Sequence, residues 1–245
     1  MIDRSRLARS TLDVSAVPVA DLTAGYAVQT ALTARRLARG AAIIGWKLGY
    51  TTAAMRTQLG IAEPNFGPLL DTMRLDDGAT VPEAVLHPRV EPEIALVLGH
   101  DVDGPLDADE ALAACAEAVV ALEVVDSVWA DYRFDLEHNT ADGSSAAYVV
   151  TGAALPLDAL ADIEVTLHRN GAHVGTGTGA AAMGHPARAL AWLTAQLSGR
   201  GVTLHAGDVV ITGGLVAAVP LQRGDVVHAD FDHPSTSTRR VSVRR

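Results

Sequence analysis

The chain has 245 residues, 49% of them hydrophobic, and a net charge of −10. This size allows one large core, and the acidic balance with scattered basic residues makes nucleic acid a poor candidate partner. The lack of an apolar run of about 18 residues excludes a membrane-spanning helix, and the charged N-terminus is unlike a secretory signal. A single cysteine, Cys115, excludes an intrachain disulfide and is consistent with a cytoplasmic protein.

The first part of the chain is predicted to be largely helical. A helix is expected over residues 19–40, ending at Gly40 after a basic last turn. Residues 42–50 have the apolar character of a short strand, and a short helix is expected to follow. Residues 63–73 are rich in proline and glycine and are predicted to form a loop.

From residue 89 onward the pattern changes to strands. Two helices interrupt it, one over Asp107–Val120 with a capping-box start and one over residues 187–198. Strands or hairpins are expected at 89–99, 122–128, 146–152, 163–177 (with an Asn170-Gly171 turn) and in several short segments from 207 to the end. The chain is therefore predicted to be α+β, with a helical N-terminal portion (1–85) and a β-rich remainder (86–245) that together form one continuous unit.

The strand RVEPEIALVLG contains two acids in an apolar setting. Side chains alternate along a strand, so Glu91 and Glu93 point to the same face. Three interpretations are open: a solvated face, basic partners such as Arg89 or Lys47, or a divalent cation that neutralises both carboxylates.

A third acid favours the cation. Glu123 lies in the apolar segment ALEVVDSV, which is another predicted strand. Three carboxylates without nearby Cys or His suit a hard ion that prefers oxygen, so Mg²⁺ or Mn²⁺ is favoured over zinc. The nine histidines show no ligand spacing such as H-x-x-x-H, and we expect them to be surface or packing residues.

The chain also resembles a known family. The blocks that carry the resemblance occur in the family's order: GWKLG (45–49), FGPLLDTM (66–73), HPRVEPEIALVL (87–98), LEVVDS (122–127), ADGSSAAYVVTG (141–152) and GDVVITGG (207–214). They resemble the 2-oxopent-4-enoate hydratase / 4-oxalocrotonate decarboxylase family of the fumarylacetoacetate hydrolase superfamily. The resemblance implies a mixed β-roll with flanking helices, a homo-oligomer that can associate with a hydratase or decarboxylase relative, and a small 2-oxo acid as substrate.

The resemblance implies roles for particular residues. Glu91, Glu93 and Glu123 match the family's Mg²⁺ or Mn²⁺ ligands, while Lys47 and Asp71 match its active-site lysine and acid. The candidates for substrate binding are Asp142, Ser144, Ser145, Thr212 and Gly213. For each of them the alternative is a purely structural role in a turn or a cap. The chain departs from the family's pattern at Tyr50, Asn65 and Gly143.

The expected reaction is loss of CO₂ from an unsaturated 2-oxo acid through an enolate that the cation stabilises. Hydration of 2-hydroxypenta-2,4-dienoate is the alternative, because the two branches share their site residues. Acylpyruvate hydrolysis and an inactive oligomeric partner are further alternatives. The His–Glu dyad that hydrolysis typically requires is not found at a convincing spacing.

Overall fold

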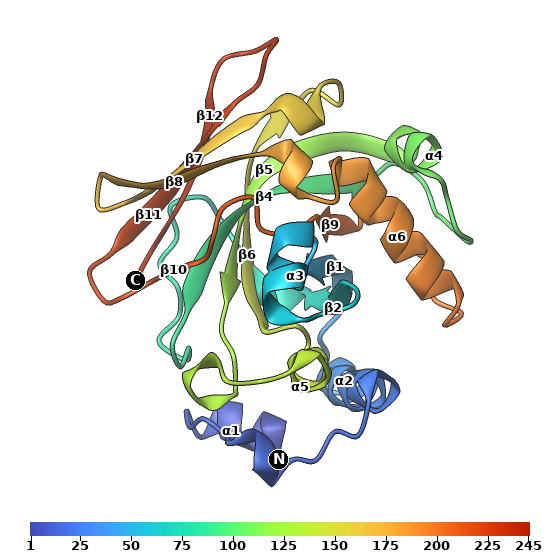
Figure 1. The fold of residues 1–245 in the computed structure, drawn as a ribbon, viewed down its shortest axis with the longest axis vertical. Coiled ribbons are helices and arrows are strands. Elements are labelled where there is room, and N and C mark those ends of the chain that lie inside the picture. The colour runs from blue at the N-terminus through green and yellow to red at the C-terminus, as the bar shows by residue number, and fades with distance from the viewer.

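Two β-sheets form the frame of the protein (Figure 1). The structure is a computed structural model that describes residues 1–245, apart from the side chains of Ala54 and Leu59. The larger sheet has the order β2-β1-β9-β4-β5-β6-β3, with β10 paired to β4. Its strands are β1 (Ile43–Gly49), β2 (Asn65–Leu70), β3 (Arg74–Leu75), β4 (Arg89–Leu98), β5 (Cys115–Val125), β6 (Ala146–Leu155), β9 (Val209–Ile211) and β10 (Val219–Pro220).

The smaller sheet has the order β12-β11-β7-β8 and is entirely antiparallel. Its strands are β7 (Glu164–Arg169), β8 (Ala172–Thr178), β11 (Val226–Asp232) and β12 (Arg239–Arg244). In the larger sheet the β1–β9 and β3–β6 pairs are parallel and the other pairs are antiparallel. Strand β12 contacts β5 and β6, and the apolar faces of the two sheets share one buried core that includes Val120, Leu167 and Phe231.

Helices lie around the larger sheet (Figure 1). They are α1 (Ile2–Leu7), α2 (Leu22–Leu37), α3 (Ala53–Leu59), α4 (Ala108–Ala113), α5 (Leu136–Ala141) and α6 (Pro186–Ser198). Helix α2 begins after Asp21, whose side chain accepts a hydrogen bond from the backbone N–H of Ala24 at 2.8 Å, as an N-cap should. Helix α2 packs on α5, and α4 packs on α6.

The α+β prediction is confirmed, as are most of the long elements. The helix over 19–40 is α2, the strand over 42–50 is β1, and the strand over 89–99 is β4. The predicted hairpin is formed by β7 and β8, and its turn residues Asn170 and Gly171 have φ of 54° and 77°. Positive φ at both positions is what a two-residue turn of type I′ requires.

Two predictions of local structure are wrong. Residues 63–73 are not a loop, because Asn65–Leu70 forms β2 and pairs antiparallel with β1. Pro68 is tolerated since β2 is the edge strand of the sheet. The helix predicted over Asp107–Val120 ends at Ala113, and Cys115 begins β5. Pairing with β4 along nearly all of β5 overrides the helix propensity of this alanine-rich segment.

The N-terminal portion shares the larger sheet with the rest of the chain. Strands β1, β2 and β3 come from the first 85 residues and lie in one sheet with β4, β5, β6 and β9. The core therefore runs across the boundary between residues 85 and 86. Among the described residues, no helix is both long and apolar enough to cross a membrane.

Candidate active site

Three carboxylates from two neighbouring strands meet in the larger sheet. Strand β4 carries Glu91 and Glu93, and β5 carries Glu123 directly opposite Glu91 in the antiparallel register. One oxygen from each carboxylate lies within 4.8 Å of the oxygens of the other two. The side chains of Glu93 and Glu123 are fully buried, whereas Glu91 is partly exposed.

The protein supplies too few hydrogen bonds and positive charges to offset the cost of burying these carboxylates. Among the described side chains, Oε1 of Glu93 and Oε1 of Glu123 are buried without a hydrogen-bond partner, while Oε2 of Glu123 is paired with Lys47. Burial raises the pKa of Glu91 to about 7, with a further contribution from the charge of Glu123. Burial and the two neighbouring acids also raise the pKa of Glu93 well above its usual range. An ion between the three groups would remove this penalty.

Lys47 on β1 is the cation that the chain itself supplies to this cluster. Its Nζ lies 3.1 Å from Oε2 of Glu123, and it donates hydrogen bonds to the carbonyl oxygen (2.8 Å) and hydroxyl oxygen (3.2 Å) of Ser144. Burial alone would lower the pKa of Lys47, but the three carboxylates outweigh burial and raise it, so the side chain is protonated at neutral pH. If all three carboxyls were ionised, one ammonium would leave two negative charges in the cluster, which is the charge of one divalent cation.

A buried hydrogen-bond network holds Ser144 in place. The hydroxyl of Ser144 donates to Oδ1 of Asn65 (2.9 Å), and Nδ2 of Asn65 donates to Oδ1 of Asn139 (2.9 Å). Asn139 in turn donates to the hydroxyl of Ser145 at 2.9 Å. Gly143 and both serines have φ between 56° and 74°, a left-handed run that directs the Ser144 carbonyl toward Lys47.

Two glycines allow the segment after β9 to approach the acids. The backbone N–H of Gly213 donates to Oε2 of Glu93 at 2.6 Å, and its φ of 104° favours glycine. A Cβ on Gly213 would lie 2.0 Å from the Thr51 side chain, and one on Gly214 would lie 2.5 Å from Oε2 of Glu91. Larger residues at these positions would therefore displace the chain from the carboxylates.

A cavity of about 760 Å³ opens onto the cluster. Lys47 and Glu91 form part of its wall, together with Ser144 and Ser145. Lys47 and Arg89 are the basic side chains among its described lining residues, and the Arg89 guanidinium lies 4.3 Å from the centre of the Tyr132 ring. Other residues that line the cavity include Tyr50, Thr51, Met55, Val125, Phe134, Asn139 and Gly214.

Asp71, which the resemblance places in the active site, lies away from this cluster. It is exposed at the end of β2, where its Oδ1 accepts hydrogen bonds from the backbone N–H groups of Ala42 (3.1 Å) and Thr72 (2.8 Å). The chain leaves the strand at Leu70 and turns, so the carboxylate caps the turn and does not line the cavity. Asp71 is therefore not among the residues that the fold brings together at this cluster.

Thr212 and Asp142 are buried but also lie outside the cavity lining. The Thr212 hydroxyl donates to the carbonyl of Ile94 at 2.9 Å and ties the end of β9 to β4. Asp142 accepts hydrogen bonds from Arg6 (2.7 and 3.0 Å) and from the backbone N–H of Val128 (2.8 Å). Asp142 directly precedes the 143–145 segment, so it positions that segment and does not contact the cavity.

Replacing Arg6 with methionine is expected to lower the free energy of unfolding by about 3 kcal/mol, because it leaves the buried Asp142 carboxylate unpaired. Arg39→Met is the matched control, since Arg39 makes an exposed ion pair with Asp3 whose loss has little effect. Urea denaturation of both variants measures the difference. Equal stability of the two variants would contradict the assigned role of Arg6.

The sequence interpretation missed Asn139, the hydrogen-bond role of Asn65 and the fact that Lys47 is the only lysine. Lys47 is the only lysine in a chain that has 18 arginines. A single lysine retained in an apolar strand indicates a task that a guanidinium does not perform. Asn65 and Asn139 had no such local signal, because their connection exists only between β2 and α5 in the folded chain.

The chain matches the model of the fumarylacetoacetate (FAA) hydrolase C-terminal family over residues 71–242. It is 38% identical over 207 residues to a 2-keto-4-pentenoate hydratase of Paraburkholderia xenovorans (strain LB400), covering 82% of this chain and 77% of the relative. It is 36% identical over 205 residues to a 4-oxalocrotonate decarboxylase of Pseudomonas sp. (strain CF600), covering 82% of this chain and 78% of the relative.

Among solved structures, the 4-oxalocrotonate decarboxylase from Pseudomonas putida G7 complexed with magnesium and adipate has a TM-score of 0.91. Its sequence is 31% identical, and the match covers 99% of this chain and 94% of that one. The predicted β-roll with flanking helices is thereby confirmed. Family model, relatives and fold agree, and this chain belongs to the fumarylacetoacetate hydrolase family.

Proposed function

We propose that this protein is a lyase that depends on a divalent metal ion and acts on an unsaturated 2-oxo acid, with 4-oxalocrotonate decarboxylation as its reaction. The observation that carries the proposal is the carboxylate group Glu91, Glu93 and Glu123, which meets a large cavity where Glu91 and Lys47 line the wall. Relatives that carry out 4-oxalocrotonate decarboxylation support the choice of reaction.

The residues present fit a hard dication. Oε1 of Glu93 and Oε1 of Glu123 are buried without a partner, and the three carboxylates together would carry two more negative charges than Lys47 balances, which suits an Mg²⁺ or Mn²⁺ ion. When bound there, such an ion would polarise the 2-oxo group of a chelating substrate and stabilise negative charge that develops on its oxygen. The solved relative's complex with magnesium supports this assignment.

Lys47 is the proposed acid in the reaction. Loss of CO₂ breaks the bond between the distal carboxylate and its carbon, and the electron pair moves through the conjugated chain to the 2-oxo group. A proton must then reach that oxygen, giving the dienol. The Lys47 side chain faces the cavity and is oriented by both Ser144 oxygens, so as an ammonium it can donate this proton.

The part of the cavity wall formed by Arg89, Met55, Val125 and Phe134 suits a dicarboxylate with an apolar middle, whereas Glu63, Asp135 and Glu137 line other parts of the cavity. Arg89 supplies a guanidinium for a substrate carboxylate, and its packing over Tyr132 holds it at the wall. Met55, Val125 and Phe134 provide apolar surface for the unsaturated chain. The adipate bound to the solved relative is itself a six-carbon dicarboxylate, which supports this class of substrate.

Hydration of 2-hydroxypenta-2,4-dienoate is the second candidate reaction. It is favoured by the 38% identity to a 2-keto-4-pentenoate hydratase, and it would use the same polarised oxygen while water adds to the double bond. The hydrolase alternative loses support, because no histidine is found among the described residues that line the cavity. Intact Glu91, Glu93, Glu123 and Lys47 argue against an inactive partner.

Mass spectrometry of the products separates the two reactions. The protein is incubated with Mg²⁺ and either 4-oxalocrotonate or 2-hydroxypenta-2,4-dienoate. If the protein is a decarboxylase, we expect the first substrate to lose CO₂ and the mass of the second substrate to stay unchanged at early times. Gain of water by the second substrate, with the first unchanged, would replace decarboxylation with hydration. No reaction with either substrate would overturn the proposed lyase.

We further propose that the enzyme works in the cytoplasm as a homo-oligomer. The single cysteine, Cys115, is buried at the start of β5, which is compatible with a reducing compartment. Association with a hydratase or decarboxylase relative is part of the same proposal. Mass measurement of the purified protein by light scattering tests the homo-oligomer directly.

A further inference from the structure

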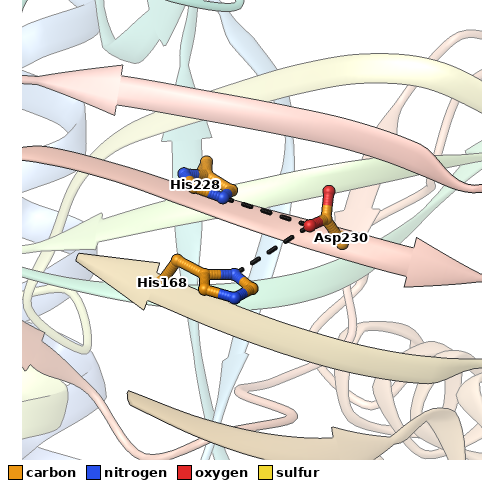
Figure 2. A group of neighbouring side chains, drawn as sticks. All are labelled: His168, His228 and Asp230. Carbon is orange, nitrogen blue, oxygen red and sulfur yellow. Dashed lines mark ion pairs between the residues drawn. The ribbon is translucent and has the colours of Figure 1, made fainter. Parts of the chain in front are cut away.

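The outer face of the four-stranded sheet carries a group of histidines that the lyase reaction does not use. His168 on β7 lies directly opposite His228 on β11, and Asp230 lies two residues beyond His228 on the same face (Figure 2). Leu167, which precedes His168, and Ala229, which lies between His228 and Asp230, point to the opposite face and are fully buried. The side chains of His168, His228 and Asp230 are only 22%, 17% and 16% exposed.

The three side chains converge on one point. Nδ1 of His168 lies 3.9 Å and Nε2 of His228 lies 4.0 Å from the same oxygen of Asp230, Oδ2. All three atoms lie within 4.8 Å of one another. Zinc–ligand bonds of about 2.1 Å place tetrahedral ligand atoms roughly 3.4 Å apart. Small side-chain rotations that move each ligand atom by less than about 1 Å would therefore bring these atoms to bonding positions.

Arg240 holds the carboxylate in this orientation. Its Nε donates to Oδ1 of Asp230 at 2.6 Å and its Nη2 donates to Oδ2 at 2.8 Å, while Oδ2 faces the two imidazoles (Figure 2). Carboxylates that bind metal ions are commonly fixed by such a second hydrogen-bond partner. Arg240 lies on β12, the strand next to β11, so β7, β11 and β12 all contribute to this group of side chains.

The histidines are suited to binding a metal in their neutral form. Their rings are stacked, with centroids 4.7 Å apart and planes at 14°, so protonating both would place two like charges in contact. Nδ1 of His168 is buried and lacks a hydrogen-bond partner among the described atoms.

We propose that His168, His228 and Asp230 form a second metal site that binds a transition-metal dication of the zinc type. Two imidazole nitrogens and one carboxylate oxygen suit Zn²⁺, in contrast to the all-oxygen group formed by the glutamates. A water molecule would complete the tetrahedron. The ion would join β7 to β11 on the outer face of the sheet, and the site is independent of the proposed lyase reaction.

Calorimetric titration of the whole protein with Zn²⁺, in excess Mg²⁺ to occupy the glutamate site, tests the proposal. We expect one equivalent of Zn²⁺ to bind, and we expect His168→Ala and His228→Ala each to weaken binding at least about tenfold. His205→Ala is the control, because His205 is an exposed histidine whose Nδ1 lies 3.3 Å from Asp101 in a single pair. Its Zn²⁺ affinity should equal that of the unchanged protein.

Electron paramagnetic resonance with Cu²⁺ as the probe gives a second measurement that identifies the ligand atoms. We expect coupling to imidazole nitrogen in the protein saturated with Mg²⁺, and we expect its loss in the His168→Ala/His228→Ala double variant. Turnover of the 2-oxo acid by that variant should be unchanged and reports that it is folded. Equal Zn²⁺ affinity of all variants, or a copper spectrum without histidine-dependent nitrogen coupling, would overturn the proposed site.

Discussion

A Glu123→Gln variant is expected to lose kcat/KM by at least about 10³-fold, equivalent to about 4 kcal/mol of transition-state stabilisation. Glu123 is fully buried and lies opposite Glu91; its Oε1 lacks a hydrogen-bond partner and its Oε2 is paired with Lys47. Glutamine has nearly the same size but removes the negative charge, so the proposed cation would be held by two carboxylates instead of three. Steady-state kinetics with 4-oxalocrotonate at saturating Mg²⁺ measures the effect.

Glu117→Gln is the matched control for this variant. Glu117 lies on the same strand, β5, but its side chain is exposed, so the same chemical change should leave kcat/KM unchanged. Thermal unfolding of both variants shows whether the fold is retained. A folded Glu123→Gln variant with activity close to that of the unchanged protein would contradict the metal role of Glu123, as would full turnover of the unchanged protein in EDTA.

A Lys47→Met variant is expected to lose kcat by about 10²–10⁴-fold, the usual contribution of a positioned proton donor. Methionine fills the space of the buried lysine without carrying a proton. The three carboxylates remain, so Mn²⁺ binding should persist and is measured by electron paramagnetic resonance of the free ion. A fall in kcat with retained Mn²⁺ binding separates the role of Lys47 from that of the metal ligands.

Lys47→Arg distinguishes proton donation from simple ion pairing. Arginine keeps the positive charge near Glu123 but remains protonated throughout the accessible pH range. The proposed role predicts that Lys47→Arg is as impaired in kcat as Lys47→Met. If arginine restored kcat, or if Lys47→Met retained full activity, Lys47 would be reduced to a residue that only compensates the charge of the carboxylates.

The elements that were predicted correctly have signals contained within one segment. Helix α2 has a capping aspartate and a glycine after its end, and the β7–β8 turn has the Asn170-Gly171 pair. The elements that were predicted wrongly depend on a partner strand. Pro68 in β2 and the alanine-rich start of β5 both contradict local propensity, and pairing with β1 or β4 decides their conformation.

The same distinction applies to the candidate site. Strand alternation placed Glu91 and Glu93 on one face, but the register that puts Glu123 opposite Glu91 exists only once β4 and β5 pair. The cross-strand histidines were missed for the same reason, since His228 comes 60 positions after His168 in the sequence. Asp71 was placed by matching a block of sequence, and its side chain turns outward where β2 ends.

The central claim is that the three glutamates bind the catalytic cation. Crystals grown with Mn²⁺ and measured at the manganese absorption edge test it most directly, because the anomalous signal locates the ion without reference to activity. The account predicts a strong peak within bonding distance of Glu91, Glu93 and Glu123, and its loss in crystals of Glu123→Gln. A fully occupied Mn²⁺ peak elsewhere in the cavity, with these carboxylates free of metal, would contradict the account.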